Sequence, residues 1–478
     1  MTKGFKNMKF KRFIAAFMAA ALISPQAFAE RSEESDYFDL MLSHAANLYI
    51  DDSITEDDLV RAAIEKILKE NPDAMYEMIK GAFESLDDYS DYYTAEEYDK
   101  YYRALNKVFY GMGVVVQRRG GDFVILRVYD DGGAMTAGIE KGDKIREVDG
   151  KSTEGMSLEE VVDAVSGEEG TFVNVKIERG GELLSFDIER KKVNEETVAH
   201  SILPGDIGYV EILSFAEMTP YEVKDALYDF DAAGVDKVIL DLRDNPGGVL
   251  TSVVSVAQLI VPEGIITQTI YRDEDKNEIF YSSLKEPKFK FTVLVNEETA
   301  SAAEVLTGAL KDSGSYVIGR TTFGKGVIQN VYNLKNGDAF KITTGHYLTR
   351  NGSDINKVGI EPDEVVLNST RPITLSRYEE FENGVKWRVG DSGNGVLAAK
   401  QRLAALGYYN GEEDEYFDEY LEQAVYAFQE KAGLYPYGVL DFSTQATMQN
   451  EFCKLEEVVD DQFVTAYEYL GGNAADLE

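Results

Sequence analysis

The stretch VILDLRDNPGG, residues 238–248, contains the pattern from which the fold can be worked out. A mainly apolar run over residues 238–242 stops at a turn rich in Asn, Pro and Gly, which is typical of a buried strand. A second such run, residues 291–295, also leads into a turn, and strand and helix patterns alternate around both. This alternation predicts an α/β layer domain over residues 194–377, with its chemistry where strands end.

The pattern changes on both sides of this domain. Residues 92–193 contain short strand patterns separated by glycine turns, whereas residues 30–91 contain amphipathic helical patterns. Downstream, a glycine-rich break at residues 384–393 precedes two further amphipathic helical patterns. We therefore expect a multidomain α/β protein with these parts: a helical arm (30–91), a strand-rich domain (92–193), the α/β domain (194–377), a small helical domain (384–452) and a C-terminal tail (453–478).

The first 29 residues have the composition of a secretory signal peptide. A basic stretch precedes an apolar run, residues 13–24, and Ala27-Phe28-Ala29 offers small residues at a cleavage position. The apolar run is short for a membrane span. We expect a secreted or cell-envelope protein that is cleaved after Ala29, and the alternative is a signal kept as an anchor.

Composition excludes several classes of function. The chain carries 86 Asp and Glu against 48 Lys and Arg, a formal net charge of -38, which repels nucleic acid. Binding to anionic lipids or anionic wall polymers would need a specific pocket, because the overall charge repels them. The only cysteine, Cys453, excludes an intramolecular disulfide and a cysteine-based zinc cluster. No nucleotide or metal motif occurs, so we expect no cofactor and no metal.

Histidine is scarce, which bears on the choice of a catalytic base. A Ser-His-Asp triad would have to use one of three residues: His44, His200 and His346. His44 falls in the helical arm and His346 in a strand-like run. The GDSG sequence at residues 390–393 copies the nucleophile motif of trypsin-like proteases, but it stands in a linker, so we interpret it as a loop. A protease of this composition would more naturally use a lysine.

The segment NEETASAAE, residues 296–304, places Ser301 where a strand pattern ends and a helix pattern begins. Ser301 and Glu304 fit a capping box, which alone would explain the serine. The same position suits a nucleophile, because N–H groups at a helix N-terminus stabilise developing negative charge. Both interpretations are open at this point.

Two glycine-containing segments complete a candidate site. In GRTTFGKGVIQ, residues 319–329, Lys325 lies between glycines. It is either a solvated loop lysine or a base, and a base must be desolvated, because free lysine has a pKa of about 10.4. Gln329 could orient its amine. In residues 240–248, Gly247 and Gly248 either form a simple turn or offer N–H groups to an oxyanion.

Together these segments resemble the carboxyl-terminal processing proteases, also called tail-specific proteases. The motifs that carry the resemblance are LDLRxNPGG at 240–248, VNxxTASAAE at 295–304 and RTxFGKGxxQ at 320–329. The resemblance implies a crotonase-like α/β core over residues 194–377.

The resemblance also implies roles for particular residues. Ser301 would be the nucleophile, Lys325 its general base, and Gln329 the residue that positions the lysine. The N–H groups of Gly248 and Ala302 would form the oxyanion hole.

The segment YGMGV is similar to the carboxylate-binding loop of a PDZ domain, which the resemblance places over residues 92–193. Its N–H groups would hold a substrate's C-terminal carboxylate, and the strand that follows would pair with the tail. The residues concerned are Gly111, Met112, Gly113 and Val114.

The C-terminal module, residues 384–452, resembles a helical peptidoglycan-binding domain, although Lys400 stands where Gln is usual. A purely structural module is the alternative.

Our hypothesis is a secreted serine endopeptidase that cuts proteins near their C-terminal tails. Its partners would be proteins with exposed tails and peptidoglycan, and the resemblance implies a homodimer. Two alternatives remain open: an inactive scaffold that binds tails and cell wall, and a peptidoglycan peptidase.

Overall fold

The computed structural model describes residues 33–48, 50, 53–119, 121–382 and 384–477. The expected signal peptide, residues 1–29, lies outside these residues. Across the described ranges, no helix is both long and apolar enough to cross a membrane. The chain folds into two compact units that interleave along the sequence.

The first unit comprises residues up to Tyr102 with Gln268–Ile279 and Gly326–Leu348. Its helices are α2 (Glu33–Leu48), α3 (Glu56–Glu70), α4 (Ala74–Glu84) and the start of α5 (Ala95–Asn106). Thr55 and Asp58 form a capping box that begins α3.

Strands from inside the predicted α/β domain join the helical arm in this first unit. The sheet order is β1-β18-β13-β14, with β17 beside β18. Its members are β1 (Asp91–Tyr93), β13 (Gly264–Tyr271), β14 (Glu278–Ser282), β17 (Val327–Asn333) and β18 (Ala339–Leu348). The buried hydroxyl of Tyr92 donates to Asp338 (2.6 Å) and fastens β1 to the start of β18. The arm is therefore part of a folded unit with its own sheet.

A PDZ-like domain opens the second unit. Its sheet has the order β3-β4-β5-β7-β8, so β3 is an edge strand among the described residues. Glycine turns separate strands whose alternate apolar residues fill one core, among them Phe123, Ile145 and Ile177. The elements are β2 (Val108–Gly111), β3 (Val114–Arg119), β4 (Asp122–Val128), α6 (Gly133–Ala137), β5 (Lys144–Val148), β6 (Lys151–Ser152), α7 (Leu158–Val165), β7 (Phe172–Arg179), β8 (Glu182–Glu189) and β9 (Lys191–Asn194).

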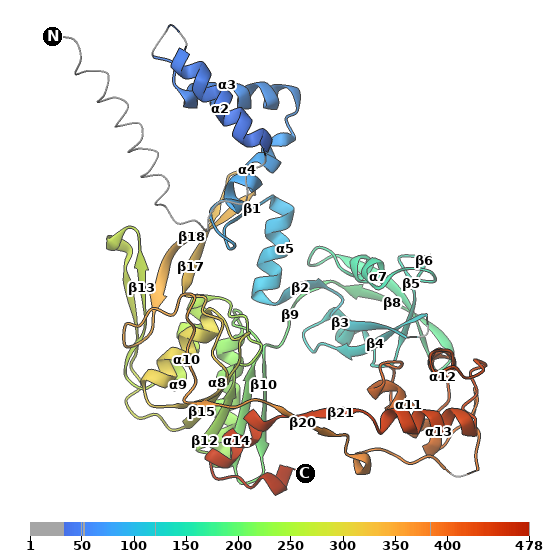
Figure 1. Ribbon diagram of the computed structural model, residues 1–478. Helices are drawn as coiled ribbons and strands as arrows, with labels where there is room; N and C mark the ends of the chain where they lie inside the picture. The colour runs from blue at the N-terminus through green and yellow to red at the C-terminus, as the bar shows by residue number, and fades with distance from the viewer. Residues whose placement is uncertain (1–32, 49, 51–52, 120, 383, 478) are drawn as a thin grey trace, which may run out of the picture. The chain divides into compact units, whose positions relative to one another are not determined.

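The expected α/β layer domain is built on a sheet with the order β10-β11-β12-β15-β16-β19. All neighbouring pairs are parallel except β10 with β11. The strands are β10 (Val198–Leu203), β11 (Ile207–Ile212), β12 (Lys237–Asp241), β15 (Lys290–Val295), β16 (Tyr316–Gly319) and β19 (Glu364–Val365). The helices that connect them are α8 (Thr219–Ala233), α9 (Leu250–Ile260) and α10 (Ala302–Asp312) (Figure 1).

The C-terminal module is inserted between two paired strands. β20 (Ser369–Pro372) and β21 (Glu456–Val459) form an antiparallel ribbon. Between them lie α11 (Asn394–Ala405), α12 (Glu419–Lys431) and α13 (Phe442–Phe452), with a core of their own. The described residues also contain three short 3-10 helices: η1 (Glu274–Lys276), η2 (Leu375–Arg377) and η3 (Ala474–Leu477).

The residues after the module differ from the tail that we expected over 453–478. They form β21 and then α14 (Asp461–Tyr469), which packs on one face of the α/β sheet. Ala466, Tyr467 and Leu470 are buried against Ile239, Leu294 and Ile318, which alternate with residues facing the other way. The Tyr467 hydroxyl also donates to the Pro204 carbonyl oxygen (2.8 Å).

Candidate active site

Two neighbouring strands bring the candidate loops together. β12 and β15 are parallel and in register from Lys237 with Lys290 to Asp241 with Leu294, so the loops that follow them leave the same edge of the sheet. We call residues 243–248 the glycine turn and residues 296–301 the serine turn. The N–H of Ala300 donates to the Asn245 carbonyl oxygen (2.9 Å), which ties one turn to the other.

Asn245 organises the glycine turn from inside the protein. It is fully buried, and its Nδ2 donates to the Ile212 carbonyl oxygen (2.6 Å). Its Oδ1 accepts the N–H of Gly247 (2.8 Å). The amide of Gly247 is therefore occupied within the turn itself.

Glycine is required where the glycine turn meets the serine turn. A Cβ atom at Gly247 would lie 2.8 Å from Ser301 Cβ and 2.9 Å from the Ala302 nitrogen, and the residue has φ +100°. A Cβ at Gly248 would lie 2.2 Å from the Phe215 carbonyl oxygen. Gly247 therefore allows the turn to approach Ser301 closely, and Gly248 allows it to pack against the backbone of Phe215.

The two amides expected to form an oxyanion hole belong to Gly248, in the glycine turn, and to Ala302, directly after the serine turn. Ala302 is the first residue of α10, where a helix leaves its N–H without an intrahelical partner. Within the part of the chain that the structure describes, neither the N–H of Ala302 nor that of Gly248 donates a hydrogen bond. Both N–H groups therefore lack an acceptor among the described residues, unlike the N–H of Gly247, although Ala302 itself is only 3% exposed.

Ser301 has the backbone conformation of a sharp turn. Its φ is +56° and its ψ is −117°, a region that non-glycine residues rarely adopt and that costs about 1–3 kcal/mol. Such strain is held by surrounding structure and gathers at functional sites. The Glu304 N–H donates to the Ser301 carbonyl oxygen (2.9 Å), so capping this amide does not require the Ser301 hydroxyl.

Glu304 connects Ser301 to the segment that contains Lys325. Its carboxylate is fully buried in the first turn of α10 and accepts four hydrogen bonds. Oε2 accepts the N–H groups of Ser301 and Lys325, both at 2.8 Å. Oε1 accepts the Thr322 hydroxyl (2.6 Å) and the Gly324 N–H (2.7 Å). Sequence reasoning gave this residue only a capping role, and the S-x-x-E spacing was the one signal for it.

Lys325 is half-buried and lies in the loop of residues 320–325, which we call the lysine loop. Gly324 packs there against backbone, because a Cβ would lie 2.9 Å from the nitrogens of Val358 and Gly359. Gln329 belongs to β17 in the other compact unit, where its Nε2 donates to Thr343 Oγ1 (3.2 Å). Its role towards Lys325 stays a prediction.

The loop expected to bind a carboxylate joins β2 to β3. Met112 points into the PDZ core and is 1% exposed, and its carbonyl oxygen accepts the Ala134 N–H (2.7 Å). Gly113 has φ +83°, and a Cβ there would lie 2.6 Å from Gly132 Cα. Gly111 and Val114 end β2 and begin β3. The free edge of β3 thus starts directly after the loop.

The other motif candidates lie elsewhere. His200 pairs with Asp229 (3.1 Å), and His346 lies within β18. Ser392, in the GDSG sequence, forms an isolated bridge with Tyr416 inside the C-terminal module. His346 thus lies in a strand, as the strand-like run predicts, and Ser392 lies directly before α11.

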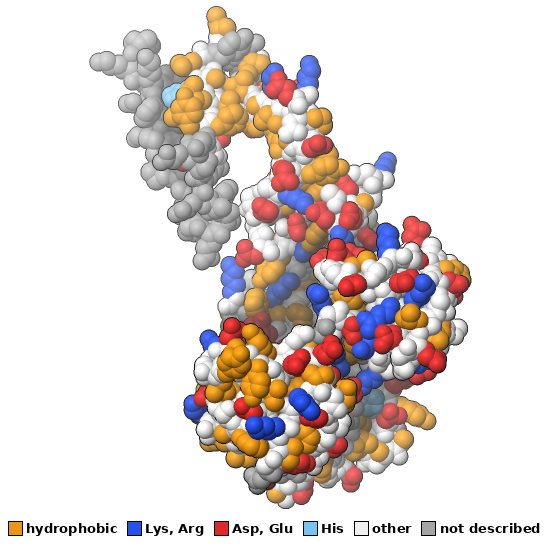
Figure 2. Space-filling model, turned by 90° about the vertical axis from the view of Figure 1, so that its right-hand side faces the viewer, with side chains coloured by type: hydrophobic (Ala, Val, Ile, Leu, Met, Phe, Trp, Pro, Cys, Tyr) orange, Lys and Arg blue, Asp and Glu red, His pale blue; other side chains and the backbone are white. Residues whose placement is uncertain are grey.

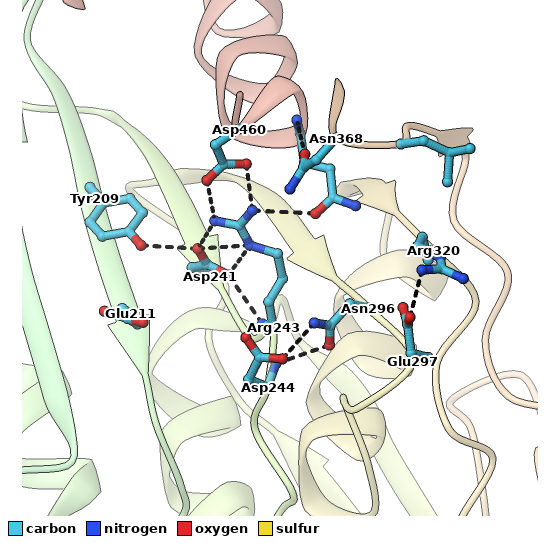
Figure 3. A pocket seen from close by; sticks show the side chains of 12 residues that line it. Tyr209, Glu211, Asp241, Arg243, Asp244, Asn296, Glu297, Arg320, Asn368 and Asp460 are labelled. Carbon is cyan, nitrogen blue, oxygen red and sulfur yellow. Dashed lines mark hydrogen bonds and ion pairs between the residues drawn. The ribbon is translucent and has the colours of Figure 1, made fainter. Parts of the chain in front are cut away.

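A polar pocket of about 600 Å³ lies beside the glycine and serine turns, and sequence reasoning missed it. Figure 3 shows Arg243 at its centre, held by Asp241 and Asp460. Burial opposes the charge of Arg243, but these hydrogen bonds outweigh it and raise the pKa of the guanidinium. Burial and the nearby Asp241 raise the pKa of Glu211. Asp460 follows the inserted module, so no local pattern could reveal this contact.

Comparison with known proteins gives three matches to family models. Residues 206–366 match peptidase family S41, residues 124–179 match a PDZ domain, and residues 392–448 match a peptidoglycan binding domain. These ranges fall within the α/β domain, the PDZ-like domain and the inserted module.

Curated relatives align with most of the chain. The "Probable CtpA-like serine protease" of Staphylococcus aureus (strain N315) is 35% identical over 78% of this chain and 72% of its own length. The "Carboxy-terminal processing protease CtpA" of Bacillus subtilis (strain 168) is 32% identical over 82% of this chain and 84% of its own length. A solved photosystem II D1 C-terminal processing protease is 29% identical, with a TM-score of 0.41, covering 70% of this chain and 94% of its own. The identity and coverage of the two curated relatives show that the chain belongs to peptidase family S41, the carboxyl-terminal processing serine proteases.

Proposed function

We propose that this chain is a secreted endopeptidase that cleaves proteins near their C-termini with Ser301 as nucleophile and Lys325 as general base. The observation that carries the proposal is the buried Glu304 carboxylate, which binds the backbone N–H groups of both residues. The strained turn at Ser301 and the N–H groups of Gly248 and Ala302, which have no acceptor among the described residues, support it further.

In the proposed reaction, the neutral amine of Lys325 removes the hydroxyl proton of Ser301 as its oxygen attacks the peptide carbonyl. The N–H groups of Gly248 and Ala302 stabilise the oxyanion that forms. The leaving amine takes the proton from Lys325, and water then hydrolyses the acyl-enzyme. Gln329 would position the lysine.

The PDZ-like domain would capture the substrate tail. The amides of the loop from Gly111 to Val114 would bind the terminal carboxylate, and the tail would pair with the free edge of β3. Leu158 and Val162 of α7, which contacts β3, are partly exposed and would favour apolar tails. Converting the substrate carboxylate to an amide should therefore raise KM.

Three further parts of the proposal concern export, attachment to the cell wall and dimer formation. Residues 1–29 would direct export with cleavage after Ala29, and the inserted module would hold the enzyme near peptidoglycan. A homodimer is supported by the exposed apolar side chains of the helical arm, seen at the top of Figure 2. They belong to α2 and the residues just after it: Tyr37, Phe38, Leu40, Met41, Leu48 and Ile50.

The test is digestion of an unfolded protein with an apolar C-terminal residue by wild type, Ser301→Ala and Lys325→Ala. We expect cleavage by the wild type alone. Equal cleavage by all three proteins would contradict the dyad, and no cleavage by the wild type would favour an inactive scaffold. Release of muropeptides from cell wall, with protein substrates untouched, would instead indicate a peptidoglycan peptidase.

A further inference from the structure

Arg243, the first residue of the glycine turn, is fixed by two carboxylates. Its Nε and Nη2 donate to Asp241 at 2.9 and 2.6 Å, and its Nη1 and Nη2 donate to Asp460 at 2.6 and 2.9 Å (Figure 3). The Tyr209 hydroxyl also donates to Asp241 (2.9 Å). Nη1 also donates to Gln462 Oε1 (3.3 Å). The Arg243 side chain is 15% exposed, so its position depends on these partners.

Asp460 reaches this position from the far side of the inserted module. It directly follows β21 and is the N-cap of α14, where its Oδ1 accepts the Phe463 N–H (3.1 Å). One face of α14 packs on the sheet and so fixes the backbone next to Asp460. The Asp460 side chain is 44% exposed, and its carboxylate accepts from both the Phe463 N–H and the Arg243 guanidinium. The two-point contact with the Arg243 fork is the strong form of such a pair.

The glycine turn depends on Arg243 through a short and strained connection. Asp244 has φ +59° and exchanges two hydrogen bonds with Asn296 of the serine turn (2.9 and 2.8 Å). Asn245 follows, and its side chain accepts the N–H of Gly247, the residue at which a Cβ would meet Ser301. A shift of Arg243 would therefore be transmitted to residues that contact the nucleophile.

We propose that Asp460 is a positioning residue for catalysis. By holding Arg243, it keeps the glycine turn where the Gly248 amide can stabilise the oxyanion. The segment after the inserted module would thus complete the active site of the α/β domain. This inference rests on the proposed function, because it assumes the Ser301 nucleophile and the Gly248 amide.

The test compares Asp460→Asn with Glu457→Gln in the full-length protein. Glu457 is a matched control, because it also lies in the β21 segment and pairs with Arg371 (2.7 Å), away from the glycine turn. The measurements are kcat and KM on an unstructured peptide with an apolar C-terminal residue, together with the thermal midpoint. For Asp460→Asn we expect kcat to fall about 10- to 100-fold with KM changed less than about threefold. Glu457→Gln should keep kcat within about twofold.

Two conservative variants separate positioning from folding. Asp460→Glu should recover part of the lost kcat, because it keeps the charge and both oxygens. Arg243→Lys keeps the charge but loses the planar fork, so it should reproduce the fall in kcat even if Asp460→Asn does not fold.

Several results would overturn the inference. The inference would fail if Asp460→Asn or Arg243→Lys had the same kcat as Glu457→Gln. It would also fail if either variant changed KM alone. If cleavage by the wild type did not depend on Ser301, the proposed function would fail as well. Cleavage that depends on Ser301 but is indifferent to Asp460 would refute this inference alone.

Discussion

Replacing Glu304 by Gln tests the connection between Ser301 and Lys325 most sharply. The carboxylate is fully buried and accepts four hydrogen bonds, two at each oxygen. An amide of the same shape must point its NH₂ group at one of these pairs. If it faces Ser301 and Lys325, two backbone donors lose their acceptor. If it faces Thr322 and Gly324, the hydroxyl can rotate to accept, but the Gly324 N–H stays unsatisfied.

The expected magnitude follows from that count. Each buried donor left without an acceptor costs about 1–3 kcal/mol, and the remaining hydrogen bonds weaken because the acceptor is now neutral. We therefore expect Glu304→Gln to lower the free energy of unfolding by about 2–5 kcal/mol. This is a large share of the roughly 5–15 kcal/mol that stabilises a typical domain. The turns should also shift, so kcat should fall at temperatures where the variant is still folded.

The assay is urea unfolding followed by far-UV circular dichroism, with tail cleavage measured on the same samples. Glu298→Gln is the matched control, because Glu298 is exposed in the same serine turn and its substitution should cost no more than about 0.5 kcal/mol. If the Glu304 and Glu298 variants had the same unfolding midpoint and the same kcat, the reasoning about the buried carboxylate would be wrong.

Three further predictions concern other parts of the molecule. Gly247→Ala should lower kcat at least about tenfold, because the new methyl group would contact Ser301 and Ala302. Steady-state kinetics test this, with Gly234→Ala as the control, because Gly234 is also a glycine with a left-handed backbone. Val162→Asp should raise KM for substrates with apolar tails, and it should change the thermal midpoint little because Val162 is 42% exposed. An equal KM of the wild type for apolar and acidic tails would argue against this. Tyr467→Ala should destabilise the α/β domain by about 3–5 kcal/mol in denaturant unfolding, because it empties a fully buried site under the sheet. A change below about 1 kcal/mol would show that α14 contributes little to the stability of the domain.

Local patterns were enough to predict the elements around the site. Residues 238–241 of the apolar run over residues 238–242 lie in β12, and the run over residues 291–295 lies within β15. Parallel pairing of these strands then brings the glycine turn to Ser301, as strand ends in an α/β sheet would. The start of α10 directly after Ser301 also agrees with the predicted helix.

Contacts between distant segments could not be predicted in the same way. The S-x-x-E spacing marks Glu304 as a cap, but its hydrogen bonds to Thr322, Gly324 and Lys325 depend on how two loops meet in space. Residues 461–469 fall within the tail expected from the sequence, because the buried face of α14 has its partner only in the folded sheet. Likewise, β17 and β18 join the helical arm through pairings that no local pattern specifies.

The most direct test of the dyad is the rate at which a serine-directed fluorophosphonate modifies Ser301, followed by intact-protein and peptide mass spectrometry. We predict one adduct per wild-type chain, located on Ser301. Lys325→Ala should react about 100-fold more slowly or not at all, since the general base contributes about 10²–10⁴-fold. An adduct on another serine such as Ser392, or equal rates for Lys325→Ala and wild type, would contradict the assignment of Ser301 and Lys325.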